Sequence, residues 1–383
     1  MTTKEKLLEL FEANKGTYFS GEELAENLAV SRAAVWKAVK SLRSEGYAID
    51  AATNKGYCLS TATDILSPQG IRKYLNTENQ KLNLTVLPTV TSTNAVVREL
   101  ADSGRVNREH VSGNRASVTW MDGYQADCNQ ANSSQKRDNQ GIECVVVANE
   151  QTKGRGRRGR EFYSPEGTGV YMSLLLKPNH YSARQAMRFT TMAAVAMCEA
   201  IEEVAQKALE EATEKTIEGA SEKTVEKASE YKAQIKWVND IFLRGKKVCG
   251  ILTEASFDLE SGALDYAVLG VGINVYPPKD GFPGELAETA GYLFEDTRDD
   301  CKNRLAAAFL NHFQEYYQAE DVSDYTEKYR NRSLAMDRKI TVISGNQTRN
   351  AFVYGIDEEC RLMVRYDNGE TEHLAYGEIK IQF

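Results

Sequence analysis

The sequence is poor in histidine, and its cysteines are scattered. It has four histidines, none close to another or to a cysteine, so neither a His-ligated metal site nor a His-based catalytic dyad is expected. The seven cysteines are odd in number and never stand two residues apart, which argues against a disulfide framework and a zinc cluster. We therefore expect reduced, mostly buried thiols and no metal held by side chains.

Long hydrophobic runs are also missing. No stretch approaches the roughly eighteen apolar residues that a membrane-spanning helix needs, and Met1 is followed by Thr, Lys and Glu rather than by a basic and apolar export signal. We expect a cytoplasmic protein that does not enter the membrane. With 383 residues, 42% of them hydrophobic and 27% charged, the chain is long enough for two or three globular domains.

The chain has a net charge of −8, so any contact with nucleic acid must come from a locally basic element. Residues 31–60 supply one, because five basic residues against Glu45 and Asp50 leave a net charge of +3 there. The basic residues are Arg32, Lys37, Lys40, Arg43 and Lys55.

Residues 1–64 are predicted to form a winged helix-turn-helix domain. Apolar residues recur at helical spacing over 4–13, and Ser20 with Glu23 forms a capping-box pattern that opens a second helix. Ser31 is a plausible N-cap of a third helix that ends near Gly46. Two β-prone runs then form a hairpin wing, at 47–51 and 56–59.

The outward side of the third helix is the candidate DNA contact. Basic side chains there would neutralise phosphates, while the start of the helix would reach base edges in the major groove. One such module binds weakly, so operator recognition would require a dimer. The alternative is a small three-helix interaction domain with solvated lysines. The candidate contact residues are Ser31, Arg32, Ala33, Trp36, Lys37 and Lys40.

Two polar segments interrupt the central part, at about 103–141 and 205–232. The first is rich in Asn, Gln, Ser and Asp without clear periodicity, and we expect a surface insertion without chemistry. Within the second, residues 212–230 repeat with a period of eight, which does not build a straight apolar stripe on a helix. A solvated helical extension is expected, with a partner-binding coiled coil as the alternative.

Three segments between residues 85 and 275 contain the side chains that indicate a ligand-binding or catalytic site. Ser92-Thr93-Asn94 follows a β-prone run at 84–90 and opens an amphipathic helix, a position that helix capping alone can also explain. An apolar strand at 144–148 leads into Gln151 and an alternating Gly-Arg run over 154–160. Glycines let that backbone wrap closely around a ligand, and guanidinium groups pair with phosphate or carboxylate. A nucleic-acid or targeting patch is the alternative, disfavoured because a strand at 169–176 follows.

The third segment is a predicted strand from Ile235 to Leu243 that turns at Arg244-Gly245 and returns over 248–254. Strand alternation places Lys236 and Trp237 on opposite faces. A lysine in an apolar strand needs an anion to offset its desolvation. The alternative is that Lys236 lies on an edge strand and prevents aggregation. The next strand, at 266–275, contains two glycines that allow a flat ligand to approach.

The chain contains five motifs in the order Ser-Thr-Asn, Gln-x-x-Gly-Arg-Gly-Arg-Arg-Gly-Arg, Lys-Trp-Val-Asn-Asp, Gly-Ile-Leu-x-Glu and Gly-x-Gly-Ile-Asn. In this order, they closely resemble the motifs of the biotin protein ligases. With the amino-terminal winged helix, the chain resembles their bifunctional class, which also represses the biotin operon. The resemblance covers nearly the whole chain apart from the two insertions. It implies a multidomain α+β protein with a central mixed-sheet α/β ligase domain over 65–332.

The resemblance implies roles for the motif residues. Arg155, Arg157 and Lys236 would be catalytic, beside the biotin carboxylate and the α-phosphate of ATP. Phe162 stands where many relatives have tryptophan, and Val238 where many have proline. The implied biotin-binding residues are Ser92, Thr93, Asn94, Gln151, Gly154, Arg155, Gly156, Arg157, Lys236 and Gly250. The implied ATP and adenylate residues are Arg155, Arg157, Arg158, Phe162, Lys236, Asn239 and Asn274.

The implied reaction joins biotin and ATP, with Mg²⁺, into biotinyl-5′-AMP and then transfers biotin to a lysine of a biotin carboxyl carrier protein. No nucleophilic side chain is needed, because the protein only aligns two anions and offsets their repulsion. As an adenylate-bound homodimer the protein would repress transcription at an operator. The alternatives are a non-catalytic biotin-sensing repressor and a lipoate or octanoate ligase.

Residues 333–383 are predicted to be a small β-barrel, with strands at 339–343, 349–356, 362–366 and 372–375 separated by turn residues. The resemblance implies an SH3-like barrel that helps cover ATP and receives the acceptor domain. A purely structural cap is the alternative. No site residue is assigned near the carboxyl terminus.

The basic helix gives a first testable prediction. Replacing Lys37 and Lys40 together by alanine should weaken binding to all DNA sequences alike and flatten its salt dependence, because both lysines would contact phosphates. Fluorescence anisotropy with specific and unrelated duplexes at several salt concentrations measures both effects. Unchanged salt dependence would remove these lysines from the interface.

Overall fold

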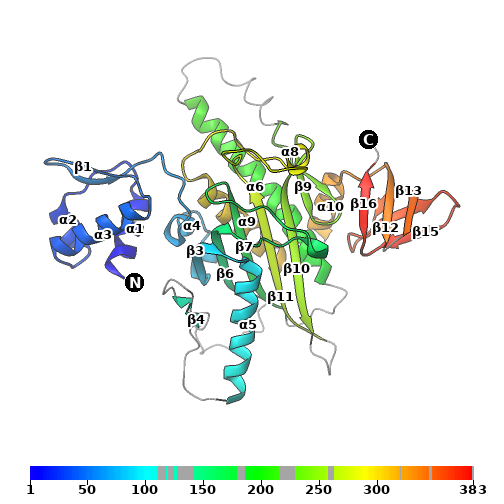
Figure 1. The fold of residues 1–383 in the computed structure, drawn as a ribbon, viewed down its shortest axis with the longest axis horizontal. Coiled ribbons are helices and arrows are strands. Elements are labelled where there is room, and N and C mark those ends of the chain that lie inside the picture. Colours follow the sequence, from blue (N-terminus) through cyan, green and yellow to red (C-terminus); the bar gives the residue numbers. More distant parts are fainter. Residues whose placement is uncertain are drawn as a thin grey trace. The chain divides into compact units, whose positions relative to one another are not determined.

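The computed structural model describes residues 1–110, 118–119, 125–126, 141–178, 186–214, 229–257, 263–319, 321, 323–344 and 347–381. The chain divides into two compact units (Figure 1). Unit 1 comprises Met1–Gln80 and Asp296–Ala308, and unit 2 comprises Lys81–Glu295 and Phe309–Phe383. Residues 111–117, 120–124, 127–140 and 215–228 of the predicted insertions lie outside the described residues.

Unit 1 contains the predicted three helices and hairpin. Capping boxes at Thr2 and Ser20 begin the first two helices, and the Ser31 hydroxyl accepts a hydrogen bond from the Ala34 amide at the start of the third. The elements are α1 (Thr3–Ala13), α2 (Gly21–Asn27), α3 (Arg32–Ser44), β1 (Ile49–Ala52), β2 (Gly56–Leu59), α4 (Pro68–Arg72), η1 (Asn79–Lys81) and the first part of α9 (Cys301–Gln318).

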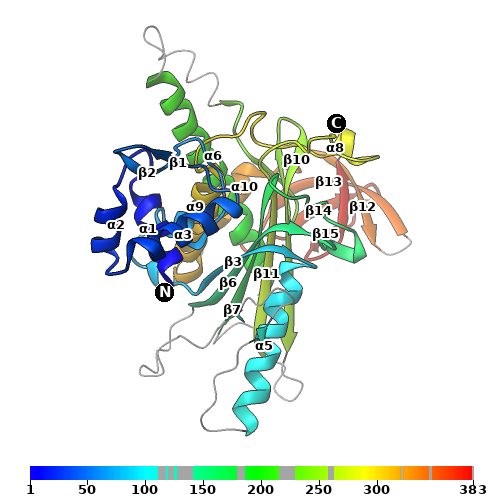
Figure 2. The ribbon, with the colours of Figure 1, turned by 60° about the vertical axis from the view of Figure 1, so that its left-hand side comes forward.

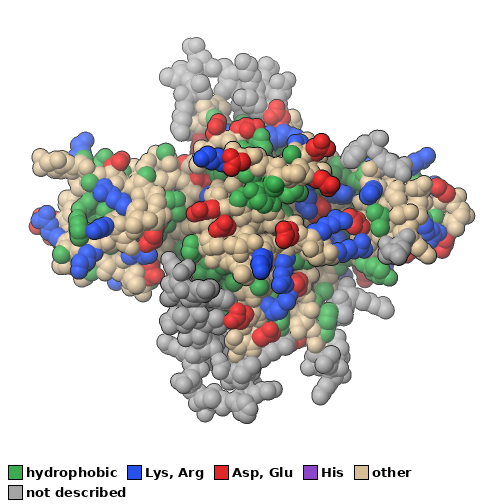
Figure 3. Space-filling model, in the orientation of Figure 1, with side chains coloured by type: hydrophobic (Ala, Val, Ile, Leu, Met, Phe, Trp, Pro, Cys, Tyr) green, Lys and Arg blue, Asp and Glu red, His purple; other side chains and the backbone are tan. Residues whose placement is uncertain are grey.

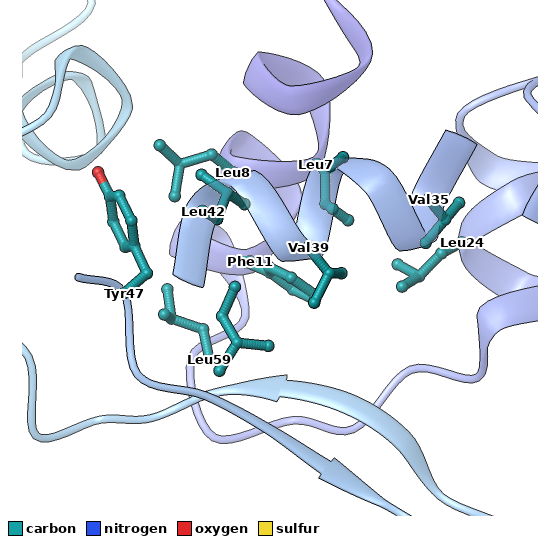
Figure 4. Packing of buried hydrophobic residues seen from close by; sticks show 11 residues of the cluster. Leu7, Leu8, Phe11, Leu24, Val35, Val39, Leu42, Tyr47 and Leu59 are labelled. Carbon is teal, nitrogen blue, oxygen red and sulfur yellow. The ribbon is translucent and has the colours of Figure 1, made fainter. Parts of the chain in front are cut away.

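The core of unit 1 forms where the apolar stripes of its helices meet the hairpin. Phe11, Leu24 and Leu42 are fully buried between α1, α2 and α3, and Leu59 of β2 closes the cluster (Figure 4). The hairpin needs Gly56, because at φ +95° a Cβ there would lie 2.0 Å from the Phe19 carbonyl oxygen. This core fixes which side of α3 remains in solvent.

Unit 2 is built on a seven-stranded mixed sheet with the order β3-β6-β7-β11-β10-β9-β8. β3 and β6 are parallel, and the other neighbours are antiparallel. The strands are β3 (Leu84–Val90), β6 (Gly141–Gln151), β7 (Gly169–Lys177), β8 (Gln234–Lys236), β9 (Asp240–Leu243), β10 (Lys246–Phe257) and β11 (Leu264–Asn274). A short pair, β4 (Val118–Thr119) and β5 (Gln125–Ala126), lies between α5 and β6 in the sequence.

Helices cover both faces of this sheet. α5 lies against β6, β7 and β11 (Figures 1 and 2), where Val97 and Leu100 pack on Leu175 and Val268. α6 packs on the opposite face, where the Thr190 hydroxyl lies 2.7 Å from that of Thr253. The helices of unit 2 are α5 (Thr93–His110), η3 (Arg157–Gly159), α6 (Ala186–Glu214), α8 (Leu286–Thr289), α10 (Ser323–Arg332) and the later part of α9.

A five-stranded antiparallel sheet with the order β15-β14-β13-β12-β16 completes unit 2. Its strands are β12 (Lys339–Ser344), β13 (Gln347–Ile356), β14 (Leu362–Tyr366), β15 (Thr371–Leu374) and β16 (Glu378–Ile381). The four predicted strands are confirmed, and β16, which pairs with β12, was missed. Because β15 and β16 are edges that do not pair with each other in the described sheet, a closed barrel is not confirmed.

Two other predictions are corrected. The expected single strand from Ile235 to Leu243 is a hairpin, since Lys236 pairs with Asp240 and the chain reverses through residues 237–239. The first insertion was expected to lack helical structure from residue 103, but α5 continues to His110. In the second, α6 extends to Glu214, consistent with a helical extension. Six of the seven cysteines lie in the described part of the chain, and all six are buried thiols, as expected.

Candidate functional site

A hydrogen-bonded polar cluster lies where β3 meets α5. Ser92, Thr93 and Asn94 are all buried, with at most 4% of each exposed. The Thr93 amide donates to Oε1 of Gln151 at 2.9 Å. Ser173 Oγ on β7 lies 2.6 Å from Asn94 Oδ1 and 2.7 Å from Thr93 Oγ1. These contacts fix neutral donors and acceptors in place.

Two residues hold the outer members of this cluster. Asn94 Nδ2 donates to Glu254 Oε2 at 2.8 Å, and Gln151 Nε2 donates to the Ser164 hydroxyl at 3.0 Å. Both side-chain amides are thereby oriented, because the oxygen and the nitrogen of each have a partner. The cluster is thus a preorganised surface for a polar, uncharged group.

Glycines on β10 and β11 let Asn94 and Phe162 approach the sheet closely beside the cluster. A Cβ at Gly270 would lie 2.1 Å from Asn94 Oδ1, and one at Gly272 would lie 2.6 Å from the Phe162 ring. Gly250 is the cross-strand partner of Gly272, and a Cβ there would be 3.3 Å from the same ring. Phe162 therefore lies over a floor without side chains, and a bulkier residue at these positions would displace it or Asn94.

The Gly-Arg segment folds back on itself after β6. The Gly156 amide donates to the Arg160 carbonyl at 2.7 Å, and the Phe162 amide donates to the Gly154 carbonyl at 3.0 Å. A Cβ at Gly154 would lie 2.2 Å from the Phe162 carbonyl oxygen, so the close return of the chain requires glycine there.

The arginines of this segment have different partners. Arg157 donates to Asn239 Oδ1 at 2.9 Å and to the Gly377 carbonyl at 3.3 Å, and its burial lowers its pKa. Arg158 and Arg160 pair with Glu378 at 3.4 and 2.7 Å. Arg157 is therefore fixed in place, whereas Arg158 and Arg160 contact the first residue of β16.

Two cations keep their charge available. In the part of the chain that the structure describes, neither Arg155 nor Lys236 forms an ion pair. The ammonium of Lys236 lies 5.9 Å from the centre of the Phe242 ring. Lys236 is half-buried and Arg155 is exposed, and a cation without a carboxylate partner favours an anionic ligand.

The turn that carries Lys236 is anchored from behind. Trp237 is buried, and its indole nitrogen donates to the Cys360 carbonyl at 3.0 Å. The hydroxyl of Tyr329 donates to the Val238 carbonyl at 3.1 Å, and Asn239 Nδ2 donates to the Ile251 carbonyl at 2.9 Å. Both Lys236 and Trp237 line the site, and Trp237 lies beyond the end of β8, so the strand alternation that was predicted to place them on opposite faces is not confirmed.

These groups surround one cavity of about 560 Å³, a volume suited to a small organic ligand. It brings together nearly all of the small-molecule site residues expected from the sequence, which are Ser92, Thr93, Asn94, Gln151, Arg155, Gly156, Arg157, Arg158, Phe162, Lys236, Asn239, Gly250 and Asn274. Gly154 does not line the cavity, and its part is to allow the chain to return beside it.

The expected DNA-contact residues share one side of α3. Ser31, Arg32, Ala33, Trp36, Lys37 and Lys40 are all exposed. The side chain of Trp36 is 53% exposed, and the Lys40 ammonium lies 5.4 Å from the centre of its ring. Basic side chains are visible over the surface of unit 1 (Figure 3).

Three family models match successive parts of the chain. The HTH domain matches residues 3–58, the Biotin/lipoate A/B protein ligase family matches 125–274, and the Biotin protein ligase C terminal domain matches 336–381. In its central and carboxyl-terminal parts, the chain is thus similar to the biotin protein ligases.

Relatives align with the chain over almost its whole length. The Bifunctional ligase/repressor BirA of Bacillus subtilis is 29% identical over 96% of this chain and 95% of its own length. The protein of the same name from Escherichia coli is 25% identical over 96% and 94%. The two units therefore occur together, in the same order, in these relatives.

A solved structure shares the fold. The biotin protein ligase from Aquifex aeolicus, in complex with biotin and ATP, is 21% identical and covers 78% of this chain and 98% of its own, with a TM-score of 0.50.

The cavity also includes residues that sequence reasoning did not assign. Lys247 lies 2.6 Å from Asp240 in an ion pair, and both line the cavity with Phe242. Gly377 and Glu378 reach it from the carboxyl-terminal sheet. The Gly-Lys-Lys turn before an apolar strand could have indicated Lys247 as a site residue. No local sequence pattern indicates residues 377–378.

Among the described residues, no helix combines the length and the apolarity that crossing a bilayer requires. Within the same residues, no three His, Cys, Asp or Glu side chains gather into a metal-binding group.

The anchoring of Arg157 gives a stability prediction. Asn239→Ala removes the acceptor of the Arg157 guanidinium and the bond to Ile251, so unfolding should become easier by about 1–3 kcal/mol. Urea unfolding compared with Asn350→Ala measures this, because Asn350 is an exposed residue of β13 whose loss should cost about 0.5 kcal/mol or less. Equal midpoints for the two variants would contradict the anchoring role.

Proposed function

We propose that this chain activates biotin with ATP as biotinyl-5′-AMP and then transfers biotin to a lysine of a biotin carboxyl carrier protein. The observation that carries the proposal is the pair of available cations, Arg155 and Lys236, in a cavity whose neighbouring wall is the neutral cluster at Ser92–Asn94. This arrangement suits a ligand with an uncharged polar ring and a carboxylate, placed beside a phosphate.

The first step joins two anions. An oxygen of the biotin carboxylate attacks the α-phosphorus of ATP, a new P–O bond forms, and the bond to pyrophosphate breaks. The cations offset the repulsion between the reactants and stabilise the charge that develops on the phosphoryl oxygens. Arg157 is suited to this task, because its bonds to Asn239 and Gly377 hold the guanidinium in position before the substrates bind.

The remaining residues are assigned by their chemistry. Ser92, Thr93, Asn94 and Gln151 would bind the ureido and ring part of biotin, with Gly250 keeping the floor open. Phe162, lying over Gly250 and Gly272, would stack on adenine, and Asn239 and Asn274 would supply polar contacts. Gly154 and Gly156 would shape the loop, and Arg158 would contribute positive charge.

ATP is proposed to enter as its Mg²⁺ complex. Magnesium is commonly held by one or two carboxylates together with substrate phosphates, and Asp240 is a carboxylate that lines the cavity. The ion would shield the leaving pyrophosphate.

In the second step the neutral amine of the acceptor lysine attacks the carbonyl carbon of the mixed anhydride. A C–N bond forms, AMP leaves with the former C–O oxygen, and the amine loses a proton. The Gly-Arg segment would exclude water until the acceptor arrives. We further propose that the carboxyl-terminal sheet is an open SH3-like barrel that covers ATP and receives the acceptor. The contacts of Arg157, Arg158 and Arg160 with residues 377–378 support this.

Unit 1 adds a regulatory function. We propose that the adenylate-bound protein forms a homodimer on operator DNA and represses biotin-operon transcription, with α3 in the major groove. The exposed row from Ser31 to Lys40 supports DNA contact, and both units occur in the BirA relatives. A cytoplasmic location is part of the same proposal.

One assay tests the catalytic proposal against its alternatives. Pyrophosphate release is measured with biotin, lipoate and octanoate as separate substrates. Release with biotin alone is expected. Release with lipoate or octanoate instead would indicate a lipoate-type ligase, and no release with any acid would indicate a non-catalytic sensor.

Lys236 provides a direct test of the charge argument. Lys236→Ala should slow adenylate formation by about 100-fold or more and change biotin affinity by less than about threefold, because the lysine acts mainly on the transferred phosphoryl group. Single-turnover adenylation and biotin titration measure the two quantities. Lys246→Ala is the control, since Lys246 bonds to the Ala287 carbonyl outside the cavity; equal rates for both variants would remove Lys236 from catalysis.

The two floor glycines separate the two substrates. Gly270→Ala forces Asn94 aside and should raise the KM for biotin about tenfold, while Gly272→Ala displaces Phe162 and should raise the KM for ATP by a similar factor. Steady-state kinetics with each substrate varied in turn measures this. The assignment of the two subsites is wrong if both variants affect the same substrate.

A further inference from the structure

Unit 1 contains a buried group of charges that neither the catalytic nor the DNA-contact proposal uses. Its members come from the end of α1, from the residues that follow α4, and from the start of α9. We call it the Asp300 cluster, and it consists of Glu12, Lys15, Lys73, Tyr74, Asp299 and Asp300.

Asp300 is the centre of this cluster and is fully buried. Its Oδ1 accepts from Lys15 at 2.5 Å, and its Oδ2 accepts from Lys73 at 3.1 Å and from the Tyr74 hydroxyl at 2.7 Å. Its amide donates to the Thr63 carbonyl at 3.1 Å. A carboxylate without exposure is stable only with such partners.

Lys15 is almost equally buried, with 5% of its side chain exposed. Besides Asp300, its ammonium reaches Asp299 at 3.3 Å and the Thr63 hydroxyl at 3.3 Å. Lys15 follows α1 of the helix-turn-helix bundle, and Asp300 lies 285 residues further along the chain. Loss of either partner would leave the other buried charge with weaker compensation, from Asp299 for Lys15 or from Lys73 for Asp300, which is more costly than the loss of an exposed pair.

Polar contacts continue from this cluster along the start of α9. The Asp64 carboxylate accepts from the Lys302 amide at 2.8 Å, and Asn303 bonds to both the Ile65 carbonyl and the Ser67 amide. A Cβ at Gly70 would lie 2.7 Å from Asn303, so α4 approaches α9 closely. Residues 296–308 are thus packed as an integral part of unit 1.

We propose that the Lys15–Asp300 ion pair is a lock that attaches the helix-turn-helix bundle to the start of α9. The lock sets how firmly α3 is presented to DNA. This inference rests on the proposed repressor function. A dimer that places two α3 helices at a fixed spacing pays an entropic cost if each bundle moves freely, so release of the lock weakens operator binding.

The experiment compares full-length variants. Asp300→Asn removes the buried negative charge opposite Lys15, and Lys4→Met is the matched control, because it breaks the exposed Lys4–Glu45 pair in the same unit. Hydrogen–deuterium exchange of peptides from residues 1–80 reports on the lock, anisotropy with a labelled duplex from upstream of the host's biotin genes reports on DNA binding, and pyrophosphate release reports on catalysis.

The lock predicts faster exchange in residues 1–80 of Asp300→Asn and at least about tenfold weaker operator binding. Adenylation should remain within about twofold of the unmodified protein, and Lys4→Met should behave as that protein does in every assay. Unchanged exchange in Asp300→Asn overturns the lock. If exchange rises in Asp300→Asn but the unmodified protein binds no DNA, the result supports the lock and contradicts only the repressor function.

A double variant keeps the test decisive if Asp300→Asn does not fold. Lys15→Met with Asp300→Asn replaces both charges and leaves neither unpaired, so the bundle should fold more stably than with Asp300→Asn alone. If the double variant exchanges as fast as, or faster than, the single variant, Lys15 and Asp300 are not coupled and the lock is wrong.

Glu12 makes the lock sensitive to pH. It is 2% exposed, and its Oε2 lies 3.5 Å from Lys15 without a hydrogen-bond partner. Lys15 and Lys73 face three carboxylates, those of Glu12, Asp299 and Asp300, with Arg304 and Tyr74 also near Asp300. Burial raises the pKa of Glu12 to about 7, partly countered by Lys15. Burial opposes the ionised form of Asp300 too, but Lys15 outweighs it and lowers the Asp300 pKa.

The sign of the pH effect follows from Glu12. Since its folded pKa of about 7 exceeds the ordinary value of 4.5, the folded state keeps a proton that the unfolded state releases, and unit 1 loses stability as pH rises from 4.5 to 7. The Asp300 shift acts only below its ordinary value of 3.8. Burial also raises the pKa of Asp299, which acts in the same direction. Exchange in residues 1–80, corrected for its intrinsic pH dependence, should therefore rise between pH 5 and 7.5 in the unmodified protein and rise less steeply in Glu12→Gln. The same slope in both would contradict this role of Glu12.

Discussion

The repulsion between a carboxylate and a triphosphate is the constraint that the catalytic unit must overcome. Two anions approach within bonding distance only where fixed positive charge faces them. In the proposed reaction, Lys236 would meet this need from a turn of the sheet that is anchored through Trp237 and Asn239. The Gly-Arg segment brings a second set of cations from the end of β6, and Asn239 and Gly377 hold Arg157 among them.

The same constraint explains why the cavity has two kinds of wall. Neutral hydroxyls and amides at the β3–α5 junction are bonded to one another, and Gly270 leaves room for Asn94. Arg155 and Lys236, which form no ion pair among the described residues, lie nearby. A ligand that carries both an uncharged polar ring and a negative group therefore finds each part complemented, and the glycines let Asn94 and Phe162 pack close to the sheet between the walls.

Much of this could be predicted from local sequence. Ser92–Asn94, the Gly-Arg run and Lys236 are short motifs next to strands, and hydrophobic alternation located β3, β7 and β11 to within a few residues. The hairpin at 237–239 was missed because residues 235–243 contain no glycine or proline to mark a turn, and the reversal depends on anchors from Cys360 and Tyr329. The contacts of residues 377–378 with the Gly-Arg segment, like the Lys15–Asp300 ion pair, join residues hundreds of positions apart. No local sequence pattern encodes such contacts.

The central claim is that the residues around this cavity promote the attack of biotin on ATP. Its most direct test is the exchange of labelled pyrophosphate into ATP by the purified full-length protein. The account predicts exchange that requires biotin and is absent with lipoate; no exchange in the presence of biotin would contradict it.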